Sequence, residues 1–112
     1  MKCVARVARS RLAESAPIQI SSEVGVLMVV RLGYAVFALE DACNHAGAPL
    51  SKGTIEERCV ICPMHQYSFD LATGELVAPR GLCGDQRSFP TSIEADEVCI
   101  WDPFPIKILG SE

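Results

Sequence analysis

The residues of this chain that can bind metal gather in two short patterns. Residues 43–45 have a Cys-x-His pattern and residues 62–65 have a Cys-x-x-His pattern. The chain has only two histidines, both of which stand in these patterns, and sixteen residues separate His45 from Cys62. Two thiolates and two imidazoles are a ligand set that suits an iron–sulfur centre or a zinc ion. The sequence therefore predicts a metal centre with four ligands: Cys43, His45, Cys62 and His65.

A second cysteine close to the later pattern leaves an alternative open. Cys59 and Cys62 form a Cys-x-x-Cys pattern, which on its own suits a dithiol redox pair or half of a zinc site. A thioredoxin-like pair would need a βαβ setting, and the sequence shows none. A zinc ion held by four of the following residues remains the alternative: Cys43, His45, Cys59, Cys62 and His65.

Three further cysteines complete the six, and we expect no disulfide framework from them. The N-terminal segment has no continuous apolar stretch, so we expect no secretory signal peptide and no export to an oxidising compartment. We expect Cys3 and Cys99, like Cys59, to pack as small hydrophobic residues. Cys83 lies in a segment predicted to be a loop, and its role stays open, as does any role of Cys59 beyond packing.

Length and composition limit the functions open to the chain. With 112 residues it supports one domain, and 49% hydrophobic residues are typical of a globular protein. A net charge of −4 argues against a nucleic-acid partner, which favours a basic surface. The longest apolar run, Val24–Val30, is far shorter than the roughly 20 residues that span a bilayer. We therefore expect a cytoplasmic protein that binds neither nucleic acid nor a membrane.

The elements that must position the ligands are predicted to be strands. Short apolar segments rich in β-branched residues alternate with Gly, Pro and Asp, and the only weak helical signal is at Ser10–Ser15. Each ligand pattern follows a predicted strand. The predicted strands are Val4–Val7, Pro17–Ile20, Val24–Arg31, Tyr34–Leu39, Ser68–Leu71, an alternating segment at Phe89–Ile93 and Val98–Trp101, with a hairpin at Ile55–Ile61. This pattern favours an all-β antiparallel sandwich or barrel.

Two segments carry turn or tail signals. Ala78–Gln86 is rich in Pro, Gly and polar residues and is predicted to be a loop. The tail at 102–112 contains Pro103 and Pro105, which prevent a regular helix, among apolar residues. We favour packing of the apolar stretch 103–109 on its own domain over a contact surface for a partner, and its role stays open.

The two patterns and their surroundings resemble the Rieske family, whose signature is Cys-x-His followed at a distance by Cys-x-x-His. Residues 47–51 (Gly-Ala-Pro-Leu-Ser) follow the first pair as in many family members, and Pro63 follows the second cysteine. Residues 69–75 (Phe-Asp-Leu-Ala-Thr-Gly-Glu) resemble the family's turn after the second pair, and 88–98 resemble its closing hairpin. The resemblance covers roughly residues 4–101.

The resemblance implies a [2Fe-2S] cluster, one per chain, and a role for each ligand. In such a centre two cysteines hold one iron and two histidines hold the other. Cys43 and Cys62 would then hold the first iron. His45 and His65 would hold the second, where neutral imidazole in place of thiolate raises the reduction potential. The implied fold is a single Rieske-like domain over 1–112 with a small cluster-binding subdomain at about 41–79 and the tail at 102–112.

The chain departs from the high-potential respiratory members of the family. Those members carry an extra, disulfide-bonded cysteine in each ligand loop, where this chain has Ala48 and Met64. They also use a Ser and a Tyr after the second histidine to donate hydrogen bonds toward the cluster, where this chain has Tyr67 and Phe69. Fewer donors lower the potential. The resemblance is therefore to the low-potential ferredoxins of ring-hydroxylating dioxygenase systems.

These observations predict a soluble one-electron carrier that catalyses nothing by itself. The sequence has no Gly-rich dinucleotide motif and no histidines left for a mononuclear iron site. The expected partners are a flavin-dependent reductase that supplies electrons and a terminal oxygenase that receives them. The alternatives are the small subunit of an NAD(P)H nitrite reductase and, less favoured, a zinc-stabilised binding module.

Overall fold

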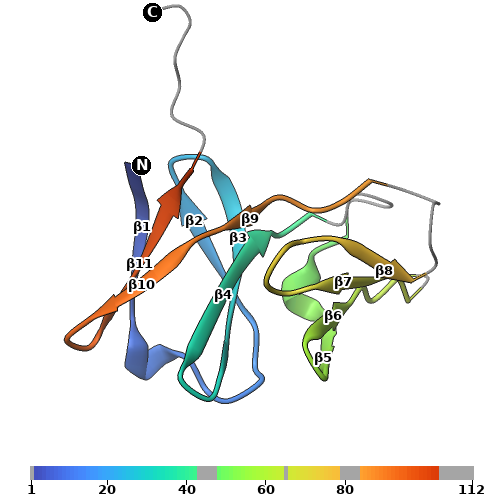
Figure 1. The fold of residues 1–112 in the computed structure, drawn as a ribbon, viewed down its shortest axis with the longest axis horizontal. Coiled ribbons are helices and arrows are strands. Elements are labelled where there is room, and N and C mark those ends of the chain that lie inside the picture. The colour runs from blue at the N-terminus through green and yellow to red at the C-terminus, as the bar shows by residue number, and fades with distance from the viewer. Residues whose placement is uncertain (1, 43–47, 65, 79–83, 104–112) are drawn as a thin grey trace, which may run out of the picture.

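The computed structural model describes residues 2–42, 48–64, 66–78 and 84–103, and Figure 1 shows their arrangement. Within these ranges the strands form three antiparallel sheets, ordered β1-β11-β10, β2-β3-β4-β9 and β5-β6-β7-β8. The strands are β1 (Lys2–Ala8), β2 (Ile18–Ser22), β3 (Gly25–Leu32), β4 (Ala35–Glu40), β5 (Thr54–Glu56), β6 (Cys59–Ile61), β7 (Ser68–Asp70), β8 (Leu76–Ala78), β9 (Ser88–Phe89), β10 (Thr91–Glu94) and β11 (Glu97–Asp102). Two 3-10 turns, η1 (Arg9–Arg11) and η2 (Leu50–Lys52), complete the described elements.

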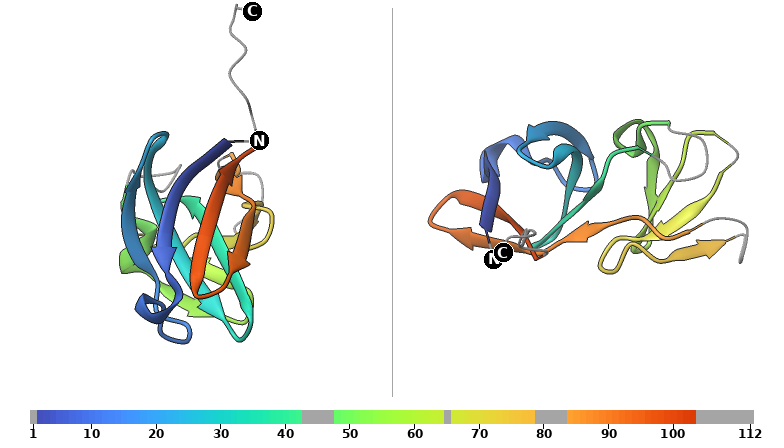
Figure 2. Two further views of the ribbon diagram at one scale, coloured as in Figure 1. Left: turned by 90° about the vertical axis from the view of Figure 1, so that its left-hand side faces the viewer. Right: turned by 90° about the horizontal axis from the view of Figure 1, so that it is seen from above.

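Two of the sheets form a base that contains both the first and the last strand. β1 pairs with β11 along almost its whole length, from Lys2 opposite Asp102 to Ala8 opposite Glu97. Val4 and Val7 are the buried residues of β1. They are three residues apart, where a regular strand alternates by two, because the pairing with β11 shifts register between Cys3 and Ala5. Figure 2 shows the β1-β11-β10 sheet, called the terminal sheet below, lying across the β2-β3-β4-β9 sheet. Side chains from both sheets fill one apolar core.

The third sheet is an insertion between β4 and β9, and it packs on the base through a second apolar core. Four consecutive residues of β3 are completely buried. Leu27 and Val29 belong to the core of the base, whereas Met28 and Val30 belong to the core shared with the insertion. Side chains alternate between the two faces of a strand, so β3 separates the two cores and contributes to both.

A surface contact also joins the insertion to the base. The guanidinium of Arg58, in the tight turn between β5 and β6, lies 5.2 Å from the centre of the Phe37 ring on β4. Such cation–π contacts add about 0.5–1 kcal/mol at exposed sites. Together with the shared core, this contact fixes how the insertion sits on β3 and β4.

The all-β prediction is confirmed, with two local differences. The weak helical signal at Ser10–Ser15 corresponds to a 3-10 turn at Arg9–Arg11, which overlaps its start, and no α-helix forms there. The hairpin at Ile55–Ile61 is present, with Glu57 at φ +57° in its turn. Strand β8 was not predicted, since only Leu76 and Val77 carry strand-forming side chains there. The predicted loop at 78–86 lies partly, and the apolar stretch of the tail almost entirely, outside the described residues.

The turn after β7 depends on a glycine. Asp70 Oδ1 accepts hydrogen bonds from the N–H groups of Ala72 at 2.8 Å and Thr73 at 3.1 Å, and Gly74 then adopts φ +81°. Gly74 lies against the backbone of Gln86, whose N–H donates to the Gly74 carbonyl at 2.7 Å. A Cβ at position 74 would overlap the Gln86 carbonyl oxygen. This close approach joins the insertion to the segment that returns to β9.

We expect Gly74→Ala to destabilise the protein more than Gly33→Ala does. Both glycines have positive φ, which costs a residue with a Cβ about 1–2 kcal/mol. A Cβ at Gly33 meets nothing within 4 Å, whereas a Cβ at Gly74 must displace the Gln86 backbone, adding about 1–3 kcal/mol. Urea unfolding of the two variants measures the difference. Equal losses would show that the Gln86 segment yields without cost.

Candidate metal centre

The second ligand pattern begins where β6 ends. The Cys62 side chain is completely buried, and its N–H donates to the Tyr67 carbonyl oxygen at 2.7 Å. This bond closes the chain between Cys62 and Tyr67 into a tight loop. Gln66, just before the closure, has φ +60°, a conformation that reverses the chain within few residues. The backbone therefore fixes the position of Cys62, a predicted ligand, at the base of this loop.

The first ligand pattern is bracketed by a matching closure. Ala42 pairs with Pro49 as an isolated antiparallel bridge, and the Leu50 N–H donates to the Asp41 carbonyl oxygen at 2.6 Å. Turn η2 follows at once and buries Leu50 completely. The two ends of the segment 43–47 are therefore held next to each other by backbone bonds.

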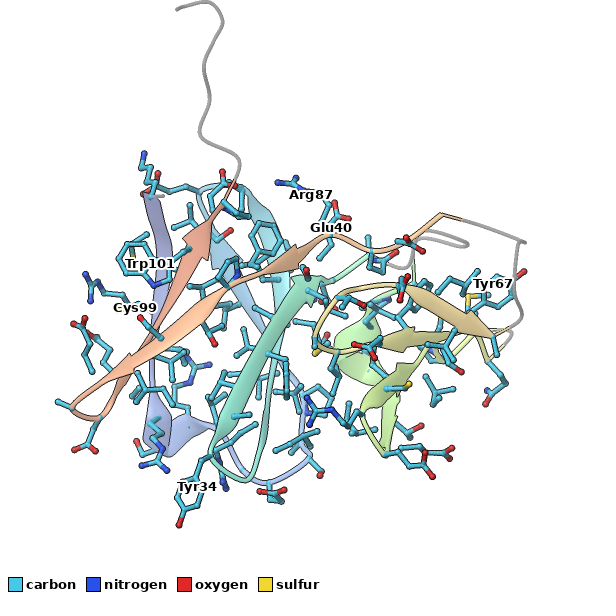
Figure 3. All side chains as sticks on the ribbon, in the orientation of Figure 1. Tyr34, Glu40, Tyr67, Arg87, Cys99 and Trp101 are labelled. Carbon is cyan, nitrogen blue, oxygen red and sulfur yellow. The ribbon has the colours of Figure 1, made fainter. Side chains whose placement is uncertain are left out.

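The two loop bases lie together in one apolar cluster. Ala48 and Leu50 from the first base and Cys62, Tyr67 and Phe69 from the second belong to the same buried core. Figure 3 shows Tyr67 at the end of the insertion that is farther from the base. The closures thus bring the described bases of the two ligand loops to one apolar core.

Of the four predicted ligands, Cys62 is the one that the structure describes. Cys43, His45 and His65 lie outside the described residues, so the complete ligand set stays a prediction. Among the residues that the structure does describe, no group of three or more His, Cys, Asp and Glu side chains is arranged to hold a metal ion. For the predicted site, the described residues therefore comprise Cys62 and the bases of the two loops.

Cys59 lies on the other side of its sheet from Cys62. Along β6 the side chains alternate, with Val60 completely buried in the cluster and Cys59 half-buried on the opposite face. Cys62 shares the cluster with Val60. Burial raises the pKa of the Cys59 thiol, and the carboxylates of Asp70 and Glu57 raise it further. This placement disfavours a Cys59–Cys62 dithiol pair and a zinc site that includes both.

The other described cysteines sit in the base. None of Cys3, Cys59, Cys62 and Cys99 forms a disulfide. The buried Cys99 Sγ accepts a hydrogen bond from Arg6 Nη1 at 3.0 Å, and burial raises the pKa of the Cys99 thiol although Arg6 opposes the shift. Packing in the terminal sheet accounts for Cys99, in line with the sequence prediction. Cys83 lies outside the described residues.

Two buried polar residues at the first loop base were missed by the sequence analysis. Asp41 and Gln86 are 2% and 3% exposed. The Asp41 carboxylate accepts from the Ser51 N–H, after the first ligand pattern, and the Gln86 amide donates to the Ala42 carbonyl oxygen, just before it. The available signal for Asp41 was a carboxyl group directly after an apolar strand and two residues before a cysteine. Gln86 carried no signal, because its partners come from a distant part of the chain.

The described surroundings fit an iron–sulfur centre. A thiolate of a fully buried cysteine is a soft ligand, and Leu50, Tyr67 and Phe69 pack around the same cluster and exclude water. The backbone closures hold the loop bases without any contribution from the metal. No helix in the described residues is long and apolar enough to cross a membrane.

Sequence comparison with known proteins finds a matching family model and similar ferredoxin proteins. A family model described as "Rieske [2Fe-2S] domain" matches residues 2–90. The ferredoxin component of the naphthalene 1,2-dioxygenase system of Pseudomonas putida is 31% identical over 101 residues, covering 89% of this chain and 95% of that protein. The anthranilate 1,2-dioxygenase ferredoxin subunit of Burkholderia cepacia is 46% identical over 48 residues, and this alignment spans 43% of the chain and 44% of that protein.

Two solved structures with a similar fold come from different kinds of system. The ferredoxin of carbazole 1,9a-dioxygenase from Nocardioides aromaticivorans superposes with a TM-score of 0.82 at 25% identity, covering 89% of this chain and 97% of that one. A putative NADH-dependent nitrite reductase small subunit from Mycobacterium tuberculosis has a TM-score of 0.75 at 18% identity, covering 87% and 94%. The second likeness concerns the fold alone.

We expect Cys62→Ser to prevent assembly of an intact cluster and Cys59→Ser to leave it intact. Cys62 is a predicted ligand and is buried in the apolar core at the loop bases, whereas Cys59 lies on the opposite face of the insertion sheet. Iron and acid-labile sulfide per chain, measured on both purified variants, check this expectation. Loss of metal in the Cys59 variant alone would mean that the ligand set is wrong and would favour a zinc-type site.

Proposed function

The chain belongs to the Rieske [2Fe-2S] domain family, and on that premise we propose that it is the ferredoxin component of a ring-hydroxylating dioxygenase system. In this role it carries one electron at a time from a flavin-dependent reductase to a terminal oxygenase. The observation that carries the proposal is the match to the naphthalene dioxygenase ferredoxin component, which spans 95% of that protein. The protein performs no chemical transformation by itself.

The proposed ligands divide between the two loops. Cys43 and Cys62 hold one iron, and His45 and His65 hold the other, as the family motif implies. The burial of Cys62 and the backbone closure of both loop bases support this set. We further propose that the whole chain, 1–112, is one domain and that the cluster-binding subdomain runs from about 41 to 79. The insertion sheet, Thr54–Ala78, lies within those bounds.

A bound [2Fe-2S] cluster supplies the capacity to take up and release one electron. The residues of the chain keep the surroundings of that cluster constant. Leu50 and Phe69 are completely buried and exclude water from the inner side of the site. Because the insertion packs on β3 through a shared core, the loops are supported by rigid elements, which limits rearrangement when the charge changes. The exposed Met64 lies on the outer side, next to a proposed histidine ligand.

The alternatives fit less well. A nitrite reductase small subunit shares the fold, but the likeness there is at 18% identity. A zinc-stabilised module that uses both Cys59 and Cys62 conflicts with their positions on opposite faces of the insertion sheet. We propose a cytoplasmic location, where reductase and oxygenase would meet the carrier.

The proposed role is tested by following electrons through a reconstituted system. The purified protein is mixed with NADH, the flavin reductase and the terminal oxygenase of a naphthalene-type dioxygenase system. We expect the visible absorption of the protein to bleach with reductase and NADH and to recover when oxidised oxygenase is added. A protein that stays oxidised with dioxygenase reductases but is reduced by a nitrite reductase large subunit would favour the alternative.

The reduction potential is expected near the low end of the Rieske range, at about −150 mV. Phe69 has no hydrogen-bond donor in its side chain, and Ala48 and Met64 exclude the loop disulfide of the respiratory members. Fewer donors leave more electron density on the cluster. Protein-film voltammetry measures the potential. A value above about +200 mV would show that donors outside these positions reach the cluster sulfurs.

Docking to partners is expected to depend on apolar contact near the site more than on peripheral charge. Met64 is 49% exposed beside the proposed ligand His65, whereas Lys52 ends turn η2 on the first loop base. Charges at an interface rim act mainly on encounter rate and are screened within about 10 Å at 0.1 M salt. We expect Met64→Glu to slow reduction by the reductase more than Lys52→Glu does, with unchanged cluster spectra.

Stopped-flow reduction at low and moderate salt compares the two variants. A larger effect of Lys52→Glu, removed by added salt, would show that docking is electrostatic.

A further inference from the structure

Asp41 is a buried carboxyl group whose oxygens all serve one place in the fold. Its side chain is 2% exposed. Oδ1 accepts a hydrogen bond from the Ser51 N–H at 2.6 Å, and Oδ2 accepts from the Ser51 hydroxyl at 2.8 Å and from Gln19 Nε2 at 2.6 Å. Hydrogen bonds to a carboxylate are about twice as strong as those between neutral groups. The carboxyl group therefore ties together β2, the end of β4 and turn η2.

The two segments that Asp41 joins are those that flank residues 43–47. Asp41 stands two residues before Cys43, and Ser51 stands four residues after Gly47. The backbone repeats the link, because the Asp41 carbonyl oxygen accepts from the Leu50 N–H at 2.6 Å. Main chain and side chain of one residue thus close the same loop.

The chain that carries Asp41 is also held from its other sides. The Asp41 N–H donates to the Val26 carbonyl oxygen at 3.0 Å. Gln86, itself buried, donates from Nε2 to the carbonyl oxygens of Ala42 at 2.7 Å and Glu40 at 3.3 Å. A shift of residues 40–42 away from β3 would break the hydrogen bond to Val26, and a shift away from the Gln86 segment would break the hydrogen bonds from Gln86.

We propose that Asp41 is a positioning residue for the first ligand loop. By holding Ser51 and Gln19 against the start of the loop, it fixes the direction in which Cys43 and His45 are presented to the cluster. This inference rests on the proposed function, since it assumes that the loop carries two ligands. Apolar side chains could close the loop base without the desolvation cost of burying a carboxyl group. What the Asp41 carboxyl group provides, and apolar side chains do not, is a set of directional hydrogen bonds.

The test uses a variant that removes the acceptors of Asp41 and keeps the branching of its side chain. Asp41→Leu leaves the Ser51 N–H, the Ser51 hydroxyl and the Gln19 amide without their acceptor. Asp41→Asn is the rescue variant, because its oxygen still accepts from the Ser51 N–H and the exposed Gln19 amide can turn over to accept from the new N–H group. Asp70→Leu is the matched control, because Asp70 caps two backbone N–H groups of a turn outside the ligand loops.

Two measurements on the cluster-loaded proteins report ligand position directly. The first is the rate at which an iron chelator removes the cluster, and the second is the set of g-values of the reduced protein in electron paramagnetic resonance. We expect Asp41→Leu to lose its cluster at least about tenfold faster than the natural protein, as for residues that orient metal ligands, with shifted g-values. Asp41→Asn recovers most of both, and Asp70→Leu changes neither.

The outcomes separate the two levels of inference. A natural protein that holds no iron and sulfide overturns the proposed function, and the positioning role with it. A natural protein that holds the cluster, with Asp41→Leu indistinguishable from it, overturns the positioning role alone. Faster loss that Asp41→Asn does not recover would also overturn it, because the restored hydrogen bonds would not matter. If Asp41→Leu does not fold, Ser51→Ala removes one donor and is expected to speed loss severalfold, and an unchanged rate in that variant would overturn the positioning role.

Discussion

The double burial of β3 is the constraint on which the rest of the structure depends. Its side chains alternate between the core of the base and the core under the insertion, so neither unit completes its apolar core without this strand. A strand covered on both faces must be apolar at consecutive positions, and Leu27, Met28, Val29 and Val30 satisfy that requirement. The insertion is thereby attached to the base by its own hydrophobic core as well as by the chain connections to β4 and β9.

Main-chain hydrogen bonds hold the bases of the candidate site in place without a contribution from a metal. One loop closes through the Ala42–Pro49 bridge and the other through the Cys62–Tyr67 hydrogen bond. Since both bases end in the same apolar cluster, the flanking segments have fixed positions that do not depend on side-chain ligation. Electron carriers benefit from such preorganisation, because a site that changes little between redox states exchanges electrons with little rearrangement. Asp41 and Gln86 add hydrogen bonds at the first loop base, which restrict its orientation more than apolar packing alone does.

Much of the fold was predictable from local patterns, and the reasons for the failures are physical. Short apolar segments rich in β-branched residues, bounded by turn residues, predicted β1 and β4, and the apolar run from Val24 predicted β3. Strand β8 was missed because three residues followed by Pro79 carry too short a pattern. Asp41 and Gln86 were missed because their importance arises from partners on β2, η2 and the return segment, which sequence spacing does not bring together. The ligand set rests on a motif, and the loop bases described here are compatible with it.

The pairing of β1 with β11 has a consequence for how such a unit can be joined to other molecules. Lys2 lies opposite Asp102 in the terminal sheet of the base, while the loop bases lie in the insertion on the other side of β3 and β4 (Figure 1). A covalent extension before β1 or after β11 therefore emerges from the sheet that is remote from the loops. A tether to an electrode or a fusion to a second protein through these strands leaves the insertion facing outward. The protein can then be joined to a larger redox assembly without changes to the insertion that contains the loop bases.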